Sequence, residues 1–177
     1  MEPAVTENLA ALLRQAQSFR RARRSYIPPQ LCYLILVPTL RCNLTCSYCQ
    51  VSRVAEEAFG FDWSEETLQA VFKFIKNLNS QKLKIEFQGG EPLLAPPFLN
   101  RVRDFCRAHV NDVEFVVCTN LQSLSETALE FLAYEDVTIS TSFDGTHEIH
   151  RRQRMNSDAD MDVFRKNVRF VLSKYGP

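Results

Sequence analysis

The sequence predicts a parallel α/β fold built from about four strand–loop–helix units. Four short apolar runs are each followed by a polar loop and then by apolar residues at helical spacing. The first run shows no polar alternation, which is typical of a strand buried on both faces of a parallel sheet. The unusual polar clusters follow these runs, at the strand ends where parallel α/β folds carry ligands. This order predicts a partial barrel or an open sheet.

The composition is that of an ordinary globular domain. The 177 residues are 45% hydrophobic, and 21 lysines and arginines balance 21 aspartates and glutamates. This balance gives no indication of nucleic-acid binding. No apolar run approaches the ~20 residues of a membrane span, and the N-terminus lacks the apolar core of a secretory signal. We therefore expect a cytoplasmic protein whose six cysteines are free or metal-bound rather than disulfide-bonded.

Residues 1–30 are expected to form a helical extension that precedes the core. Apolar residues recur at helical spacing in a predicted helix over residues 1–24, and arginines make its second half basic. This basic half is either a solvated polar face or a docking surface for an acidic partner or leader peptide. Pro28 and Pro29 end the extension, so the predicted core spans residues 31–177.

The core is expected to alternate strands and helices along its whole length. The apolar runs predict strands at residues 31–37, 83–87, 113–118 and 137–143. The helices after them are expected to begin near residue 64, to span 97–110, to begin near residue 125 and to span 161–175. Ser64 or Asp62 should cap the first helix, and Ser125 or Ser123 the third. Residues 50–62 are predicted to be a loop.

Three cysteines lie within eight residues directly after the first predicted strand. Cys42, Cys46 and Cys49 have the spacing C-x3-C-x2-C on a tight loop. A [4Fe–4S] cluster usually has four cysteine ligands, so three would leave one iron open to another ligand. Zinc is the alternative, but structural zinc sites usually combine two ligand pairs some distance apart, and no second pair follows. The other three cysteines lie in apolar segments and are expected to be small buried side chains: Cys32, Cys106 and Cys118.

A second polar cluster follows the second predicted strand, and consists of Gln88, Gly89, Gly90 and Glu91. Two adjacent glycines let a backbone come close to a ligand. Their carbonyl groups, together with the Glu91 carboxylate, can accept hydrogen bonds from an ammonium group. Taken alone, the segment is equally consistent with a plain strand-to-helix turn.

These two segments together resemble the signatures of radical S-adenosylmethionine (SAM) enzymes. The cysteine loop, with Tyr48 before its last cysteine, is similar to the cluster-binding motif of that family, and Gly89 to Glu91 resemble the motif that holds the SAM amino group. The resemblance implies a [4Fe–4S] cluster on Cys42, Cys46 and Cys49, with SAM chelated to the open iron. An electron from a flavodoxin- or ferredoxin-like donor would then allow cleavage of SAM to a 5′-deoxyadenosyl radical, which takes hydrogen from the substrate.

Two later strand ends resemble further segments of the family. Asn120 follows Thr119 where the family commonly has Thr-Asn-Gly, but Leu121 replaces the glycine. Either the turn differs here, or Leu121 adopts the conformation of a glycine. Ser142 begins a segment that resembles the Ser-x-Asp-Gly segment of members that modify peptides and proteins. The resemblance implies that Ser142 contacts the SAM carboxylate or ribose.

The same resemblance implies that Tyr48 lies beside the adenine and that an arginine after Ser142 pairs with the SAM carboxylate. The candidates for this arginine are Arg151, Arg152, Arg154 and Arg165, of which Arg154 is preferred. The alternative reading of this His- and Arg-rich segment is a solvated loop.

The full set of motifs looks most like those of maturases of ribosomally made peptides and of sulfatases, and in particular His-Xaa-Ser system maturases. The implied substrate is therefore a peptide or a protein. The family barrel has six βα units, whereas four are counted here, with no auxiliary-cluster domain. We expect a truncated barrel, a barrel completed by a second subunit, or a degenerate module that binds a cluster or zinc without catalysis. An unpaired sheet edge would favour a pairing partner.

Overall fold

The computed structural model describes residues 12–18 and 30–176. The chain divides into two units, Met1–Leu31 and Cys32–Pro177. In the first unit, residues 12–18 are helical, and the rest of the helix predicted over residues 1–24 lies outside the described residues. The second unit carries all the predicted motifs. Among the described helices, none combines the length and the apolar character that a membrane crossing requires.

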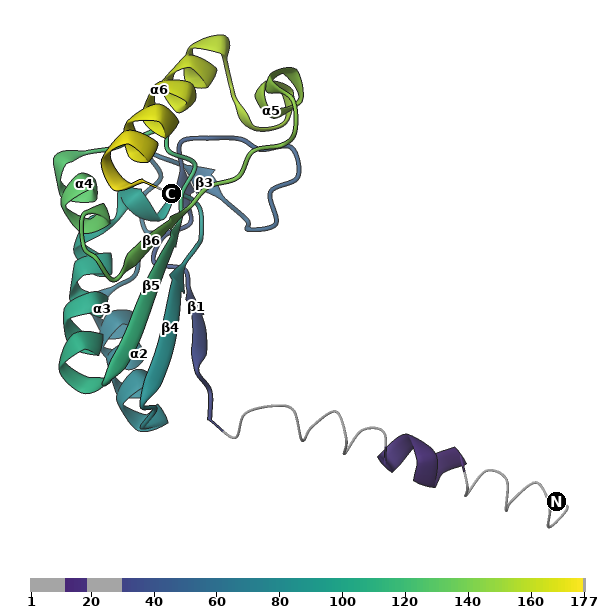
Figure 1. The fold of residues 1–177 in the computed structure, drawn as a ribbon, viewed down its shortest axis with the longest axis vertical. Helices are drawn as coiled ribbons and strands as arrows, with labels where there is room; N and C mark the ends of the chain where they lie inside the picture. The colour runs from purple at the N-terminus through teal and green to yellow at the C-terminus, as the bar shows by residue number, and fades with distance from the viewer. Residues whose placement is uncertain (1–11, 19–29, 177) are drawn as a thin grey trace, which may run out of the picture. The chain divides into compact units, whose positions relative to one another are not determined.

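A four-stranded parallel sheet forms the centre of the second unit (Figure 1). Its strands, in spatial order, are β1 (Tyr33–Leu36), β4 (Lys82–Phe87), β5 (Asp112–Cys118) and β6 (Val137–Ser140). Each neighbouring pair is parallel, so the carboxyl ends of all four strands lie at one edge of the sheet. The four predicted strand–helix units are confirmed. The sheet is open, because β1 and β6 are not paired with each other in the part of the chain that the structure describes.

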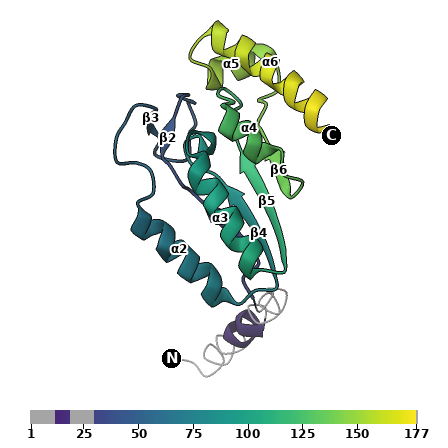
Figure 2. The same ribbon diagram turned by 90° about the vertical axis from the view of Figure 1, so that its left-hand side faces the viewer.

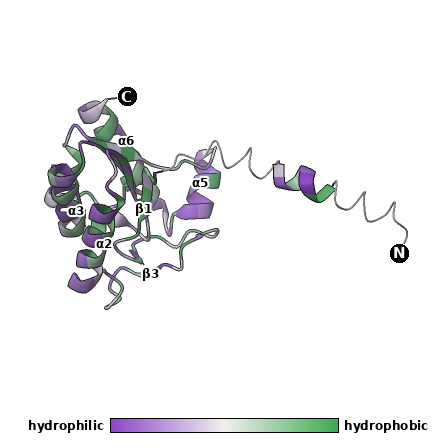
Figure 3. Ribbon diagram, turned by 90° about the horizontal axis from the view of Figure 1, so that it is seen from below, coloured by the Kyte–Doolittle hydropathy of each residue, from purple (hydrophilic) through white to green (hydrophobic). Residues whose placement is uncertain are grey.

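Three helices cover one face of this sheet: α2 (Glu65–Leu78), α3 (Pro96–His109) and α4 (Glu126–Leu132) (Figure 2). Both α2 and α3 carry hydrophobic and hydrophilic residues (Figure 3), and their apolar residues pack onto the sheet. The rings of Phe87 and Phe115 stack at 6.2 Å between centroids. Ser64 caps α2 and Ser125 caps α4, each through its side-chain oxygen, which selects one of the two caps expected for each helix.

The opposite face of the sheet departs from the sequence prediction. Tyr33 and Ile35 are 41% and 52% exposed, so the expectation of a first strand buried on both faces is wrong. The physical reason is that β1 lies at the edge of the sheet and that its neighbours on this face are polar. Lys84 of β4 is the register partner of Tyr33, and Glu114 of β5 is in turn the register partner of Lys84; both are exposed. For Cys32 the predicted burial is also wrong, since it is exposed, whereas Cys106 is buried and Cys118 is half-buried.

The segments above the carboxyl ends of the strands contain elements that the sequence did not indicate. Two short strands, β2 (Arg41–Cys42) and β3 (Val54–Ala55), pair in parallel, and β3 lies in the predicted loop. Strand β6 ends at Ser140 rather than at residue 143. The His- and Arg-rich segment forms a helix, α5 (His147–Arg154), instead of a solvated loop. Helix α6 (Asp158–Tyr175) begins before residue 161, at a capping box made by Ser157 and Asp160.

A small second core joins these segments to the cysteine loop, which we define as residues 42–49. Its buried residues are Cys42, Leu44, Leu121, Met155, Met161 and Phe164. They come from the cysteine loop, from the turn after β5 and from the region of α5 and α6. The cysteine loop is therefore packed against later parts of the chain.

Candidate functional site

A cavity of about 320 Å³ lies at the carboxyl ends of the strands. Its volume falls within the range of roughly 300–1,000 Å³ that is usual for small-molecule sites. The predicted site residues that line it are Cys42, Cys46, Tyr48, Cys49, Gln88, Gly89, Gly90, Asn120, Ser142 and Arg154. Only Glu91 of the predicted set is not among the lining residues. The cavity therefore gathers residues from the cysteine loop, from the ends of three strands and from α5.

The two glycines after β4 lie against the backbone that leads into the cysteine loop. A Cβ atom at Gly90 would lie 2.1 Å from the carbonyl oxygen of Arg41, and one at Gly89 would lie 2.4 Å from that of Thr39. Gly89 also has a φ of 132°, which side chains rarely tolerate. The Gly90 N–H donates to the Thr39 carbonyl (3.0 Å) and the Glu91 N–H to the Arg41 carbonyl (2.8 Å). The close approach that the glycines allow here is to the chain itself, and it holds the loop beside the end of β4.

Glu91 is buried behind the cavity instead of lining it. The residue is 1% exposed, and its carboxylate accepts hydrogen bonds from the backbone N–H groups of Leu93 (3.0 Å) and Asn120 (2.7 Å). Burial raises the pKa of this carboxyl to about 7. Its position differs from the expected contact with a ligand ammonium, because the motif gives no direction for the side chain that follows two glycines. In the structure, Glu91 joins the end of β4 to the end of β5.

The three thiols of the cysteine loop face the same cavity in different environments. Cys42 is 8% exposed, and its Sγ accepts hydrogen bonds from the Leu44 N–H (3.5 Å) and from Nδ2 of Asn120 (3.7 Å). Burial raises the pKa of Cys42 to about 11 and also raises that of Cys46. Cys49 is exposed. Metal binding would therefore have to displace protons from the buried Cys42 thiol and the half-buried Cys46 thiol.

This donor set fits an iron–sulfur cluster. Three thiols share one cavity, and two N–H donors already point at one of the sulfurs, as in the outer shell of a cluster. Within residues 12–18 and 30–176, no three His, Cys, Asp or Glu side chains are grouped closely enough to hold a single metal ion. A four-iron cluster does not require that grouping, because its cysteines bind to separate irons.

The turn after β5 brings Asn120 to the cysteine loop. Leu121 has a φ of 57°, so it takes the left-handed conformation usual for glycine, which is the second of the two expected alternatives. The turn is held by the Leu121 N–H, which donates to Thr119 Oγ1 (3.1 Å), and the Leu121 side chain is 1% exposed. From this turn, Asn120 donates through Nδ2 to Asn43 Oδ1 at 2.8 Å.

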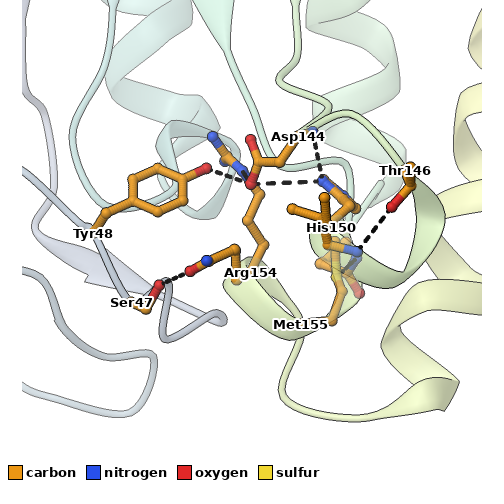
Figure 4. A network of polar contacts seen from close by, with 10 residues as sticks. Ser47, Tyr48, Asp144, Thr146, His150, Arg154 and Met155 are labelled. Atoms are coloured by element: carbon orange, nitrogen blue, oxygen red, sulfur yellow. Dashed lines mark hydrogen bonds and ion pairs between the residues drawn. The ribbon is translucent and has the colours of Figure 1, made fainter.

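A polar network at the rim of the cavity connects the cysteine loop to α5 (Figure 4). Oδ2 of Asp144 accepts hydrogen bonds from the hydroxyl of Tyr48 (2.5 Å) and from Nε of Arg154 (3.1 Å). Among the candidate arginines, only Arg154 lines the cavity. Arg151 instead pairs with Asp158 at 2.6 Å.

Two residues of this network were not expected from the sequence to be parts of the site. Asp144 belongs to the Ser-x-Asp-Gly segment, which was the signal available for it. The other is His150, which is fully buried and accepts the Asp144 N–H at Nδ1 (3.3 Å). No sequence signal separates His150 from its exposed neighbours, because its burial results from the packing of α5 on α6.

Comparison with known proteins identifies a matching family and several similar proteins. The family model described as the radical SAM superfamily matches residues 36–175. An uncharacterized protein of Methanocaldococcus jannaschii is 27% identical over 147 residues, which are 81% of this chain and 49% of that protein. The cysteine-type anaerobic sulfatase-maturating enzyme of Clostridium perfringens (strain 13 / Type A) is 29% identical over 147 residues, which are 78% of this chain and 39% of that enzyme.

Among solved structures, native anSMEcpe with bound AdoMet and Cp18Cys peptide has the same fold, with a TM-score of 0.64 at 24% identity. The match covers 83% of this chain and 41% of that chain. The chain thus spans about half the length, or less, of the relatives to which it is similar.

Proposed function

The chain belongs to the radical SAM superfamily, and we propose that it binds a [4Fe–4S] cluster and SAM for hydrogen abstraction from a peptide or protein. The observation that supports this most strongly is the shared cavity. Three cysteines and all the residues expected to bind SAM except Glu91 line one space of about 320 Å³, although they are far apart in the sequence. We also propose that residues 31–177 form the radical SAM core and that residues 1–30 are an extension of it.

Within the proposed site, one group of residues would bind the cluster and another would bind SAM. Cys42, Cys46 and Cys49 would hold the cluster, which when bound supplies the electron for cleavage of SAM to a 5′-deoxyadenosyl radical. The two N–H donors at Cys42 Sγ would stabilise its thiolate form and lower its basicity. Cys49 lines the cavity and is exposed, which leaves space beside it for a further ligand.

The remaining predicted residues of the cavity would orient SAM. The carbonyl groups of Gln88, Gly89 and Gly90 would accept hydrogen bonds from its ammonium group. Arg154 would pair with its carboxylate through the planar guanidinium, which suits bidentate binding of a carboxylate. The other predicted residues that line the cavity would contact the adenosine, the carboxylate or both: Tyr48, Asn120 and Ser142. Glu91, which we expected to be a direct ligand, would act here by holding the Asn120 backbone.

The substrate class is proposed from the similar proteins. One relative is a sulfatase-maturating enzyme and one solved neighbour contains a bound peptide, which supports a peptide or protein substrate. Membership of the His-Xaa-Ser system maturases stays a prediction. The low potential needed for SAM cleavage calls for a reducing donor, and we propose a flavodoxin- or ferredoxin-like protein. The unpaired thiols of the described residues support a reducing compartment such as the cytoplasm.

A further strand is proposed to extend the sheet, from a second subunit or from a longer chain. Strand β6 is hydrogen-bonded on one side only among the described residues. Beside it lies a groove of about 680 Å³, lined mainly by apolar residues of β6, α4 and α6, including Ile139, Val171 and Leu172. Because a strand edge offers unpaired N–H and C=O groups, a parallel apolar strand could form hydrogen bonds with the edge of β6 and place its side chains in the groove.

The direct test is anaerobic reconstitution of the full chain with iron and sulfide, followed by addition of SAM and a strong reductant. We expect about four irons per chain and formation of 5′-deoxyadenosine. Cys42→Ala should lose the cluster and the SAM cleavage. Cys32→Ala is the matched control, since this exposed thiol lies outside the cavity, and it should retain both. A full cluster and full cleavage in Cys42→Ala would refute the assignment.

The alternative function is a metal-binding module without catalysis. The open sheet favours it, because the cavity of this chain is enclosed by four strands instead of a closed barrel. Zinc without iron in anaerobically purified protein would support this alternative. Formation of 5′-deoxyadenosine would exclude it.

A further inference from the structure

We propose that Asp144 is a positioning residue that holds Tyr48 of the cysteine loop and Arg154 of α5 at the cavity. In this arrangement, His150 fixes Asp144 in turn. The identity of the ligand rests on the proposed function, but the positioning itself is a property of this chain. Nothing in the sequence motif assigns this role to Asp144, which lies two residues beyond the predicted SAM contact at Ser142.

A single carboxylate oxygen connects the two elements. Oδ2 of Asp144 accepts from the Tyr48 hydroxyl at 2.5 Å and from Nε of Arg154 at 3.1 Å (Figure 4). Tyr48 lies between two of the predicted cluster ligands, so this contact ties the middle of the cysteine loop to the segment after β6. Arg154 also lies over the Tyr48 ring, with 5.3 Å between Cζ and the ring centroid.

The pair between Asp144 and Arg154 is partly withdrawn from water. Their side chains are 21% and 18% exposed, so the pair is less screened than a fully exposed ion pair. A guanidinium has five N–H donors. Engagement of Nε by Asp144 fixes the plane of the group and leaves its terminal nitrogens able to bind a carboxylate in the cavity. Asp144 would therefore orient Arg154 for its ligand.

His150 holds the backbone of Asp144 from the other side. Its ring is fully buried and lies near Phe143 and Phe164, at 4.9 and 4.5 Å between centroids. Nδ1 accepts the Asp144 N–H at 3.3 Å, so the ring proton of the neutral imidazole lies on Nε2. Burial lowers the pKa of His150 and favours this neutral form. The ring thus anchors the turn from which the Asp144 carboxylate extends.

Other hydrogen bonds also connect the cysteine loop to the region of α5, but they do not involve Tyr48. The Ser47 N–H donates to the Gln153 carbonyl at 2.9 Å, and Asn156 Nδ2 donates to the Asn43 carbonyl at 3.1 Å. The loop would therefore stay near α5 without Asp144. What Asp144 adds is a fixed position for the Tyr48 side chain and for the guanidinium of Arg154.

The test compares Asp144→Asn with Asp158→Asn in the full chain. Asp158 is a matched control because it also accepts a bond from an arginine of α5, Arg151 Nε at 2.6 Å, but its side chain is 87% exposed. Two quantities are measured: amide hydrogen exchange of residues 43–49 in the cluster-free chain, and the dissociation constant for SAM of the reconstituted chain. Urea unfolding of both variants checks that the fold is kept.

We expect Asp144→Asn to speed exchange in residues 43–49 and to weaken SAM binding, each about tenfold, which is about 1.4 kcal/mol. Asp158→Asn should change neither. Equal behaviour of the two variants in exchange and in SAM affinity would overturn the proposal. A wild-type chain that binds no SAM would refute the proposed function instead, while the exchange measurement would still decide the role of Asp144.

A second variant tests whether Asp144 acts through Tyr48. Tyr48→Phe removes only the hydroxyl that donates to Asp144. If the two residues act together on the loop, the double variant should speed exchange hardly more than Asp144→Asn alone. Independent, additive effects of the two substitutions would contradict the proposed connection.

Discussion

Gly90 shows how the absence of one side chain sets the position of the cysteine loop. Its N–H bonds to the Thr39 carbonyl at 3.0 Å, and a Cβ would lie 2.1 Å from the carbonyl oxygen of Arg41. No flexible side chain is available to move aside, because the obstacle is backbone. The cavity therefore depends on this glycine for its walls as well as for any contact to a ligand.

We predict that Gly90→Ala destabilises the chain by about 3 kcal/mol or more, because the loop or the end of β4 must shift. Gly60→Ala is the control. Gly60 has a φ of 84°, and no atom lies within 4 Å of the position that a Cβ would take there, so its substitution should cost only the backbone strain of about 1 kcal/mol. Urea unfolding of the cluster-free chain measures both. Similar costs for the two variants would show that the close approach does not matter.

Leu121 combines an unfavourable backbone with a favourable side chain. Its φ of 57° is left-handed, which costs a residue with a Cβ about 1–2 kcal/mol. Its side chain is buried in the second core beside Leu44 and Met161, and such burial contributes about 1.5–3 kcal/mol. Packing therefore offsets the strain. This explains how leucine can occupy a position where the radical SAM family commonly has glycine.

Leu121→Ala and Leu121→Gly separate these two effects. Both lose the packing and should be destabilised by roughly 2–4 kcal/mol. Only Gly relieves the strain, so Leu121→Gly should be the less destabilised variant by up to about 1 kcal/mol, which reverses the order expected at an ordinary position. Urea midpoints and slopes give the comparison. If Leu121→Ala were more stable than Leu121→Gly, the proposed backbone strain at Leu121 would be wrong.

At the level of the elements, Glu91 joins two neighbouring strand ends. It accepts the N–H groups of Leu93 and Asn120 from full burial. Burial raises the pKa of Glu91 from 4.5 to about 7. Between these two pH values, Glu91 therefore keeps its proton in the folded chain and has lost it in the unfolded chain. The resulting contribution to stability is fully present below about pH 4.5 and is lost as the pH rises through 7.

Below the pKa of Glu91, we expect the cluster-free wild type to have a higher free energy of unfolding than Glu91→Gln. The variant cannot titrate at this position, so the advantage of the wild type should shrink as the pH rises from about 5 to about 8. Denaturant unfolding at several pH values measures it. A difference that is constant over this range would mean that Glu91 is ionised throughout.

The elements also show where sequence reasoning succeeds and where it fails. The order of strands and helices follows from periodicity, and the caps at Ser64 and Ser125 follow from local chemistry. The exposure of Tyr33 and Ile35 could not be predicted, because an apolar run has the same pattern at the edge of a sheet as at its centre. Helix α5 was missed for a related reason, since its mean composition is polar and its one buried residue, His150, depends on tertiary packing.

For the whole molecule, the parallel topology explains why most of the site could be predicted. Residues after different parallel strands meet at one edge of the sheet, so Cys42, Gly89, Asn120 and Ser142 reach one cavity. What topology does not give is the direction of each side chain. Glu91 turns away from the cavity, and Asp144, which no expectation included, organises its rim.

The most direct measurement of the central claim is the electron paramagnetic resonance spectrum of the reduced, cluster-loaded chain before and after addition of SAM. If three cysteines leave one iron open to SAM, we expect a reduced [4Fe–4S] signal whose g-values shift on addition of SAM. Cys32→Ala should behave as the wild type does. A cluster signal that SAM leaves unchanged, in a chain with about four irons, would contradict the account of the cavity as a SAM site.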